Sequence, residues 1–372
     1  MHRSTESRPE AWIIATTARL WPGDNAPSLE LLKGDASNRR FWRVRIAGES
    51  RAPRAPDSPV NDESSLRLFG AFVSAIAVDL GPDDLPFYAR ALGLLPEALP
   101  EPPWLNVHRL LTKIGVAVPA IFAADTTARM LLVEDVGDVP LFEAPQRGEA
   151  GGLYRLAIDE LMLFHVSGTR QLADDCIAAK LAYDERLFRW ELQQFVEAGL
   201  ALAGSAVDRG LLESELDQLA ARLDRFPRVL SHRDYHGHNL FVQRDASGRP
   251  RLRVIDFQDA LMAPAAQDLA VLLTTRDAAR VITPATERRL LDYYYAALIR
   301  RGVERLPFEE FRESYRLCAL QHALKVIGRF TVLEREGKSG YQHYIPFALS
   351  QARRMLSLSD GFAKLRAMLG AG

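Results

Sequence analysis

The chain has 372 residues, of which 48% are hydrophobic and 26% are charged, and its 47 basic side chains almost balance its 48 acidic ones. This composition is typical of a globular protein with a sizeable core, and it excludes a disordered or fibrous chain. Because the net charge is only −1, nothing draws the whole molecule toward nucleic acid or an anionic membrane, and we expect neither as a partner.

Cysteine use and apolar patterning bear on the compartment. The two cysteines, Cys176 and Cys318, exclude a disulfide framework and a cysteine-rich zinc site. The first residues contain no apolar signal core, and no apolar run approaches the roughly 18 to 20 residues that a membrane span requires. We therefore expect a cytoplasmic protein.

The first third of the chain is predicted to be rich in β-structure. In chain order, the pattern predicts a helix at 12–20, strands at 29–32, 41–46 and 71–80, a helix at 104–114, and strands at 120–122 and 129–133. A loop of small and basic residues at 33–40 joins the first two strands and is suited to facing an anion. The proline-containing stretches 47–63 and 81–103 are expected to be an exposed connection and an insertion.

Helical periodicity dominates after residue 151. Apolar residues recur with a period of about 3.6 at 153–166, 183–202 and 211–223, and polar residues occupy the opposite faces. Two short strands, 239–242 and 252–255, are predicted within this helical region. The residues between them contain a turn signal, so we expect the two strands to form a hairpin.

Three polar residues carry the main chemical signal. Asn239 follows Asp234 in one short loop, and Asp256 follows the predicted strand 252–255. Phosphoryl transfer needs a carboxylate that orients and deprotonates the attacking hydroxyl, and oxygen ligands that hold Mg²⁺ against nucleotide phosphates. Any one of these residues alone could cap a turn. Their joint order and spacing predict Asp234 as the catalytic base, and Asn239 and Asp256 as magnesium ligands.

The same loop contains three histidines. His232, His236 and His238 have no cysteine nearby and no predicted helix that would align them, so zinc binding is disfavoured. We expect His232 to brace the loop by hydrogen bonds. For His236 and His238, contact with a substrate and simple solvation both remain open.

The segments 232–239 and 255–260 resemble the aminoglycoside phosphotransferase and choline kinase superfamily, which is related to the protein kinases. The segments 34–41 and 337–341 add a closer similarity to the anomeric kinases of N-acetylmuramate and N-acetylglucosamine. The resemblance implies an α+β, bilobal protein-kinase-like fold. Residues 1–136 would form a small β-rich nucleotide-binding lobe, and residues 137–372 a larger helical lobe for catalysis and acceptor binding.

The resemblance also implies ATP and Mg²⁺ as cofactors and a small-molecule sugar as the partner. Nucleotide contacts would come from the 33–40 loop and from backbone groups that face the adenine. These residues are Gly34, Asp35, Ala36, Ser37, Arg40, Glu134 and Val136. His236 and Asp259 would contact the acceptor, and Asp268 would order the catalytic loop.

Two features depart from the family pattern. Protein kinases carry a phosphate-binding lysine in the third strand of the small lobe, but residues 71–79 contain none. Either Arg39, Arg40 or Arg43 supplies the missing charge, or the loop backbone and Mg²⁺ hold the phosphates. The insertion at 81–103 has no expected counterpart.

The leading interpretation is an ATP-dependent aminosugar kinase acting at an anomeric hydroxyl in cell-wall recycling. The same catalytic parts would serve a kinase of aminoglycosides, choline or another hydroxyl compound, because a fold does not choose its acceptor. Acidic residues are not concentrated, which favours a neutral or anionic sugar over a polycation. A non-catalytic binding protein with this fold is the alternative from another class. A protein kinase is disfavoured because no Ala-Pro-Glu segment follows Asp256.

Overall fold

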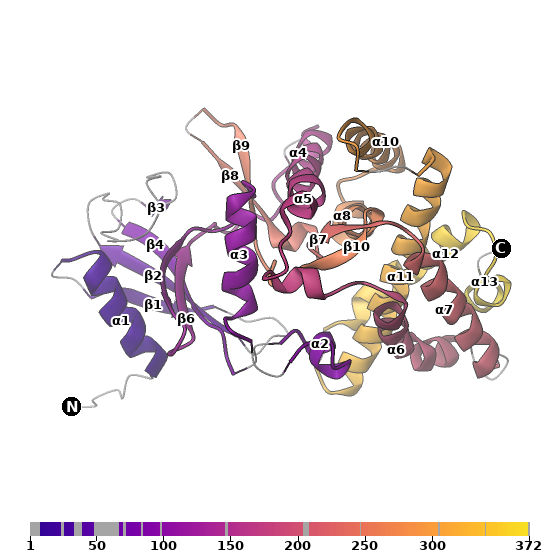
Figure 1. Ribbon diagram of the computed structural model, residues 1–372, viewed down its shortest axis with the longest axis horizontal. Coiled ribbons are helices and arrows are strands. Elements are labelled where there is room, and N and C mark those ends of the chain that lie inside the picture. Colours follow the sequence, from indigo (N-terminus) through magenta and orange to yellow (C-terminus); the bar gives the residue numbers. More distant parts are fainter. Residues whose placement is uncertain are drawn as a thin grey trace.

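A computed structural model of the protein places a β-rich part at one end and a helical part at the other, with helix α3 between them (Figure 1). The structure describes residues 8–23, 26–32, 39–47, 67–69, 72–82, 85–96, 99–145, 148–203, 208–245, 247–303, 306–338 and 340–370. Within these ranges, no helix combines the length and apolar character needed to cross a bilayer.

The β-rich part is an antiparallel sheet in the order β1-β2-β4-β6-β5, with β3 paired to β4. Its strands are β1 Ser28–Leu31, β2 Arg40–Ala47, β3 Arg67–Phe69, β4 Phe72–Asp79, β5 Ile121–Asp125 and β6 Met130–Glu134. The five strands predicted for this region are thereby confirmed. The short strand β3 lies beyond the predicted connection 47–63.

A helix covers each face of the sheet. Alternate strand residues point to opposite faces, and Trp42 and Val44 of β2 share a buried cluster with Ile13 of α1 (Arg8–Leu20). The other face packs toward α3 (Pro103–Lys113), whose buried side belongs to the main core of the molecule. The sheet is therefore anchored to the helical part through α3.

The insertion at 81–103 contains the short helix α2 (Phe87–Ala91). Its Tyr88 is fully buried, and Phe87 contacts Trp190 with ring centroids 5.7 Å apart. The insertion thus packs against the helical part of the molecule.

The helical part contains the three predicted helices and several more. The helices are α4 Ala150–Met162, α5 Thr169–Gln171, α6 Glu185–Ala203, α7 Arg209–Asp224, α8 Ala266–Thr274, α9 Arg276–Ala279, α10 Pro284–Arg300, α11 Phe308–Arg335, α12 Ile345–Ser357 and α13 Ala363–Leu369. A π-helical turn, Leu163–Gly168, continues α4, so the predicted helix 153–166 does not run in one regular geometry.

Two small antiparallel sheets frame the central loops. The predicted hairpin is confirmed as β8 (Leu240–Arg244) and β9 (Pro250–Val254). Strand β7 (Arg228–Ser231) pairs with β10 (Leu261–Pro264), and neither was predicted, because four residues are too few to show a clear alternation. The loop 232–239 follows β7, and the loop 255–260 follows β9. The two loops lie side by side.

Helix α11 crosses α6 at unusually close range. A Cβ atom on Gly328 would lie 2.5 Å from both the carbonyl carbon of Gln194 and the amide nitrogen of Phe195. Only glycine fits there without moving a helix backbone. The crossing brings the side chains of α11 against those of α6 and toward the loop that carries Asp234.

Candidate active site

Backbone hydrogen bonds hold the loop that carries Asp234. The Asp268 carboxylate, on α8, accepts the amide N–H of His232 at 2.7 Å and that of Arg233 at 2.9 Å. His232 Nε2 lies 2.9 Å from the carbonyl oxygen of Ile255 and ties this loop to the segment that carries Asp256. The predicted bracing roles of Asp268 and His232 are confirmed.

Two residues of the site adopt backbone conformations that L-amino acids rarely take. Arg233 has φ 81° and Asp256 has φ 60°. Each such conformation costs on the order of 1 to 3 kcal/mol and persists only where its surroundings impose it. The Asp268 carboxylate supplies that constraint at Arg233, so the loop is held in place rather than left to adapt.

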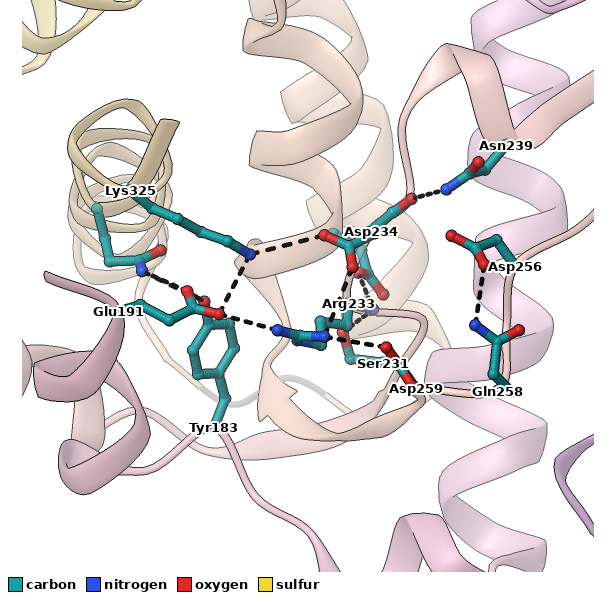
Figure 2. A network of polar contacts seen from close by, with 12 residues as sticks. Tyr183, Glu191, Ser231, Arg233, Asp234, Asn239, Asp256, Gln258, Asp259 and Lys325 are labelled. Atoms are coloured by element: carbon teal, nitrogen blue, oxygen red, sulfur yellow. Dashed lines mark hydrogen bonds and ion pairs between the residues drawn. The ribbon is translucent and has the colours of Figure 1, made fainter. Parts of the chain in front are cut away.

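The Asp234 carboxylate lies between two cations (Figure 2). Lys325 Nζ is 3.7 Å from one of its oxygens and Arg233 Nη1 is 3.7 Å from the other. Burial acts to raise the pKa of Asp234, but the charges of Lys325 and Arg233 outweigh it and hold that pKa well below its usual range. The carboxylate is therefore ionised at any working pH and can accept a hydrogen bond from a bound hydroxyl group.

A buried carboxylate from α6 fixes both cations. Glu191 Oε1 lies 3.0 Å from Arg233 Nη2 and 3.2 Å from Lys325 Nζ (Figure 2). Its other oxygen accepts hydrogen bonds from Gln321 Nε2 at 3.0 Å and from the hydroxyl of Tyr183. Burial opposes ionisation of Glu191, but Lys325 and Arg233 lower its pKa overall. Each of these buried charges has a partner, as buried charges require.

The contacts of Glu191, Gln321 and Lys325 were not predicted from the sequence. Lys325 and Gln321 stand four positions apart on α11, so they share one face of that helix. That spacing was the available signal, because two polar residues on a face that is otherwise buried need polar partners. The sequence did not name Glu191 as the partner.

Arg233 also joins Asp259 and the insertion. Its Nη1 lies 3.2 Å from Asp259 Oδ2, and its guanidinium lies 4.3 Å from the ring centroid of Tyr88. Asp259 is therefore engaged with Arg233 and is not among the residues that line the cavity described below, and its contact with the acceptor stays a prediction. The insertion at 81–103 has a structural role here, because it covers Arg233 with an aromatic ring.

Asn239 and Asp256 present oxygen atoms to the same space as Asp234. Asn239 Nδ2 donates to the backbone carbonyl of Asp234 at 2.9 Å, which turns the amide oxygen away from that bond. One oxygen of Asp256 accepts from Gln258 Nε2 at 2.9 Å, and among the described residues its other oxygen has no partner. Carboxylate and amide oxygens suit Mg²⁺, so the donor set fits the predicted metal.

The remaining magnesium ligands would have to come from elsewhere. Among the residues that the structure describes, no three His, Cys, Asp or Glu side chains are grouped in a way that could hold a metal ion. Mg²⁺ commonly keeps several waters and binds substrate phosphates through one or two protein side chains. Two protein ligands are therefore sufficient for a nucleotide-bound ion.

The three candidate arginines have different partners. Arg39 Nη1 lies 3.5 Å from Asp256 Oδ1, beside the proposed metal position. Arg40 is turned to Asp79, 2.7 Å away, and its side chain is 53% exposed. Arg43 is paired with Asp135 at 2.9 Å. Of the three, Arg39 is therefore the one that contacts Asp256, and the nucleotide contact of Arg40 stays a prediction.

The predicted adenine contacts at the end of β6 are only partly available. The amide N–H of Glu134 donates to the Ala120 carbonyl at 2.8 Å, and its side chain pairs with Arg253. The Val136 carbonyl accepts from Gln243 Nε2 at 3.4 Å, and no partner for the Val136 N–H occurs among the described residues. The predicted nucleotide contacts Gly34, Asp35, Ala36 and Ser37 lie outside the described residues.

A cavity of about 930 Å³ opens onto Asp234, Asn239 and Asp256. It continues between α9, α11 and the segment after α11, where Lys338 and Tyr341 of the 337–341 motif form part of its wall. This size falls within the usual range for small-molecule sites. The cavity can hold an acceptor molecule directly beside the Asp234 carboxylate.

Two histidines line this cavity in neutral form. Burial lowers the pKa of His236, and burial together with the nearby Lys325 charge lowers the pKa of His322 to about 4. His236 therefore lines the cavity beside Asp234, and its contact with the acceptor stays a prediction. At neutral pH both rings can exchange hydrogen bonds without adding charge.

Comparison with known proteins places the chain among phosphotransferases. The profile of the family described as "Phosphotransferase enzyme family" matches residues 28–308. The chain is 29% identical to an N-acetylmuramate/N-acetylglucosamine kinase of Caulobacter vibrioides, over 85% of this chain and 84% of that one. It is 32% identical to a kinase of the same name from Pseudomonas aeruginosa, over 66% of this chain and 70% of that one.

Among solved structures, the fold is similar to that of a Plasmodium vivax ethanolamine kinase. The TM-score is 0.54 at 11% identity, and the match covers 94% of this chain and 89% of that one. At this identity the similarity shows the fold alone. The predicted α+β, bilobal protein-kinase-like architecture is confirmed.

Proposed function

This chain belongs to the phosphotransferase enzyme family, and we propose that within it the protein is an ATP-dependent kinase that phosphorylates the anomeric hydroxyl of N-acetylmuramate or N-acetylglucosamine. The observation that carries the proposal is the meeting of Asp234, Asn239 and Asp256 at one end of a cavity large enough for a sugar. The names of the relatives from Caulobacter vibrioides and Pseudomonas aeruginosa support the choice of acceptor.

In the proposed reaction, Asp234 accepts a hydrogen bond from the acceptor hydroxyl and aims its oxygen at the γ-phosphorus of ATP. The new O–P bond forms as the bond to ADP breaks, and the hydroxyl proton passes to Asp234. Asn239 and Asp256 would hold Mg²⁺, which offsets the negative charge of the phosphates when bound. Because Lys325 and Arg233 keep the pKa of Asp234 low, it acts mainly by orienting the hydroxyl and takes the proton late.

The charges of the cavity argue against a polycationic acceptor. Its walls include four cations, Arg276, Lys325, Arg329 and Lys338, and three carboxylates, Asp234, Asp256 and Asp277. An aminoglycoside would bring several more positive charges into a site that has no acidic excess, and like charges repel. A neutral or anionic sugar fits this balance better, and so we do not favour an aminoglycoside or choline as acceptor.

We place the reaction in the cytoplasm, where ATP is available, and its product in the recycling of cell-wall sugars. We also propose that the two lobes divide near residues 136 and 137. Strand β6 ends at Glu134, and the chain then passes to the part of the molecule that carries the catalytic loop.

The direct test is an assay of the purified protein with Mg·ATP and a panel of N-acetylmuramate, N-acetylglucosamine, an aminoglycoside and choline. We expect turnover with the two N-acetylated sugars and a product that carries its phosphate on C1 by NMR. A phosphate on the 6-hydroxyl would overturn the anomeric assignment. Turnover with only the aminoglycoside or choline would overturn the acceptor class.

A further inference from the structure

Arg329 lines the cavity one helical turn beyond Lys325 on α11. Residues four positions apart lie on one face of a helix and are displaced by about 6 Å along its axis. Lys325 marks the reacting end of the cavity, because its ammonium group lies 3.7 Å from Asp234. Arg329 therefore faces a part of the bound molecule away from the reacting hydroxyl.

The positive charge of Arg329 has no acidic partner among the described residues. Of the other cations of the wall, Lys338 also has no acidic partner among the described residues, but it is exposed. Lys325 pairs with Glu191, and Arg276 lies over the ring of Tyr344, 5.1 Å from its centroid. At neutral pH His322, four positions before Val326 on the same helix, adds no charge, because burial lowers its pKa to about 4. Arg329 is thus a partly buried guanidinium that is left for a ligand.

The wall beside Arg329 is aromatic. Phe330 lies with its ring centroid 5.1 Å from that of Tyr341 and 5.4 Å from that of Tyr344. The turn that carries Tyr341 is fixed because Glu334 Oε1 accepts the amide N–H groups of Tyr341 and Gln342 at 2.5 and 3.0 Å. Such a wall suits the apolar face of a sugar ring, and it holds that ring at a set distance from α11.

We propose that Arg329 binds a carboxylate of the acceptor, namely the lactyl carboxylate that distinguishes N-acetylmuramate from N-acetylglucosamine. This inference rests on the proposed function. The lactyl ether stands on C3 of the ring and the reacting hydroxyl on C1, so the two groups leave the sugar at different points. Guanidinium and carboxylate groups match in geometry and form paired, charge-assisted hydrogen bonds.

The test compares Arg329→Ala with the unmodified enzyme on the two acceptors. We expect the KM for N-acetylmuramate to rise about 10-fold to 100-fold, the range for a lost hydrogen bond between charged groups. The KM for N-acetylglucosamine should change less than about twofold on the same scale. Arg329→Lys, which keeps the charge, should restore part of the loss. Arg335→Ala is the matched control, because Arg335 stands on the same helix, is exposed and does not line the cavity.

The assay distinguishes a failure of this inference from a failure of the proposed function. If the unmodified enzyme phosphorylates neither sugar, the proposed function fails and the role of Arg329 fails with it. If it phosphorylates both, and Arg329→Ala weakens both equally or changes only the KM for ATP, the aminosugar kinase stands and Arg329 serves the nucleotide or the fold instead. Thermal melting of each variant identifies a loss that is due to unfolding.

Discussion

The catalytic loop and helix α11 contribute to one site in different ways. The loop places Asp234 and Asn239 through short-range geometry, with backbone amides held by Asp268 and a left-handed residue at Arg233. Helix α11 is regular, and it brings Lys325 to the site only because it packs closely on α6. The positions of Asp234 and Asn239 are therefore encoded locally, whereas the charge around Asp234 depends on how the helices pack.

The largest expected effect lies in the loop, at the proposed base. Asp234→Asn keeps the shape but removes the proton acceptor, so kcat should fall by roughly two or more orders of magnitude while the affinity for Mg·ATP changes little. Turnover assays together with calorimetric titration of Mg·ATP measure the two effects. Full activity in this variant would remove Asp234 as the base.

Substitution of Asp256 should impair the enzyme in a different way from substitution of Asp234. Asp256→Asn removes an anionic ligand, so Mg²⁺-dependent nucleotide binding should weaken together with kcat, by on the order of tenfold or more, and extra Mg²⁺ should restore part of the activity. Activity measured across a Mg²⁺ titration tests this. A Mg²⁺ requirement equal to that of the unmodified enzyme would contradict the assignment.

The contribution of α11 can be tested without touching a charged group. Gly328→Ala places a Cβ 2.5 Å from the backbone of α6, so the helices must separate. The free energy of unfolding should fall by about 1 to 3 kcal/mol, and kcat should fall because Lys325 moves away from Asp234. Denaturant unfolding and turnover assays measure both.

The matched control for that change is Gly152→Ala. Gly152 is a helical glycine of α4, and a Cβ there meets no atom within 4 Å. Its stability should be unchanged or slightly higher, because alanine favours helix. Equal behaviour of the two variants would show that the α6–α11 crossing does not depend on Gly328.

The variant Lys325→Met tests how much the charge of this α11 residue lowers the pKa of Asp234. Lys325 lowers the pKa of Asp234, so in Lys325→Met that pKa should rise toward its usual value. As the solution is acidified, the variant should therefore lose activity at a higher pH than the unmodified enzyme, and its kcat at neutral pH should be roughly tenfold lower. A pH profile of kcat measures the shift. Identical acid limbs would mean that Lys325 does not act on Asp234.

The smallest expected effect concerns the arginines at the start of β2. Arg39 is partly exposed, and its contact with Asp256 is long, so Arg39→Ala should raise the KM for ATP by only about two- to fivefold. Arg40→Ala is the control and should have little effect, since Arg40 faces Asp79. If the two variants are equally impaired or equally normal, phosphate binding must rest on other groups.

Much of the fold was accessible from the sequence. Strands of the large sheet and the long amphipathic helices follow directly from apolar periodicity, because each must bury one face. The four-residue strands β7 and β10 escaped prediction, since such short segments pair only when the surrounding structure aligns them. The insertion at 81–103 was recognised by its prolines, but its contact with Arg233 through Tyr88 depends on the packed structure.

For the site, Asp234, Asn239, Asp256 and His232 could be predicted from residue types and spacing, because they lie in two short loops beside strands, whereas Asp268, on α8, was predicted from the family resemblance. The packed structure was needed to show that Asp259 pairs with Arg233, that Arg39 rather than Arg40 faces Asp256, and that Lys325 contacts both Asp234 and Glu191. The physical reason is that a helix such as α11 presents residues in every direction. Which of them meets the site depends on how closely it packs, and here the missing side chain of Gly328 sets that distance.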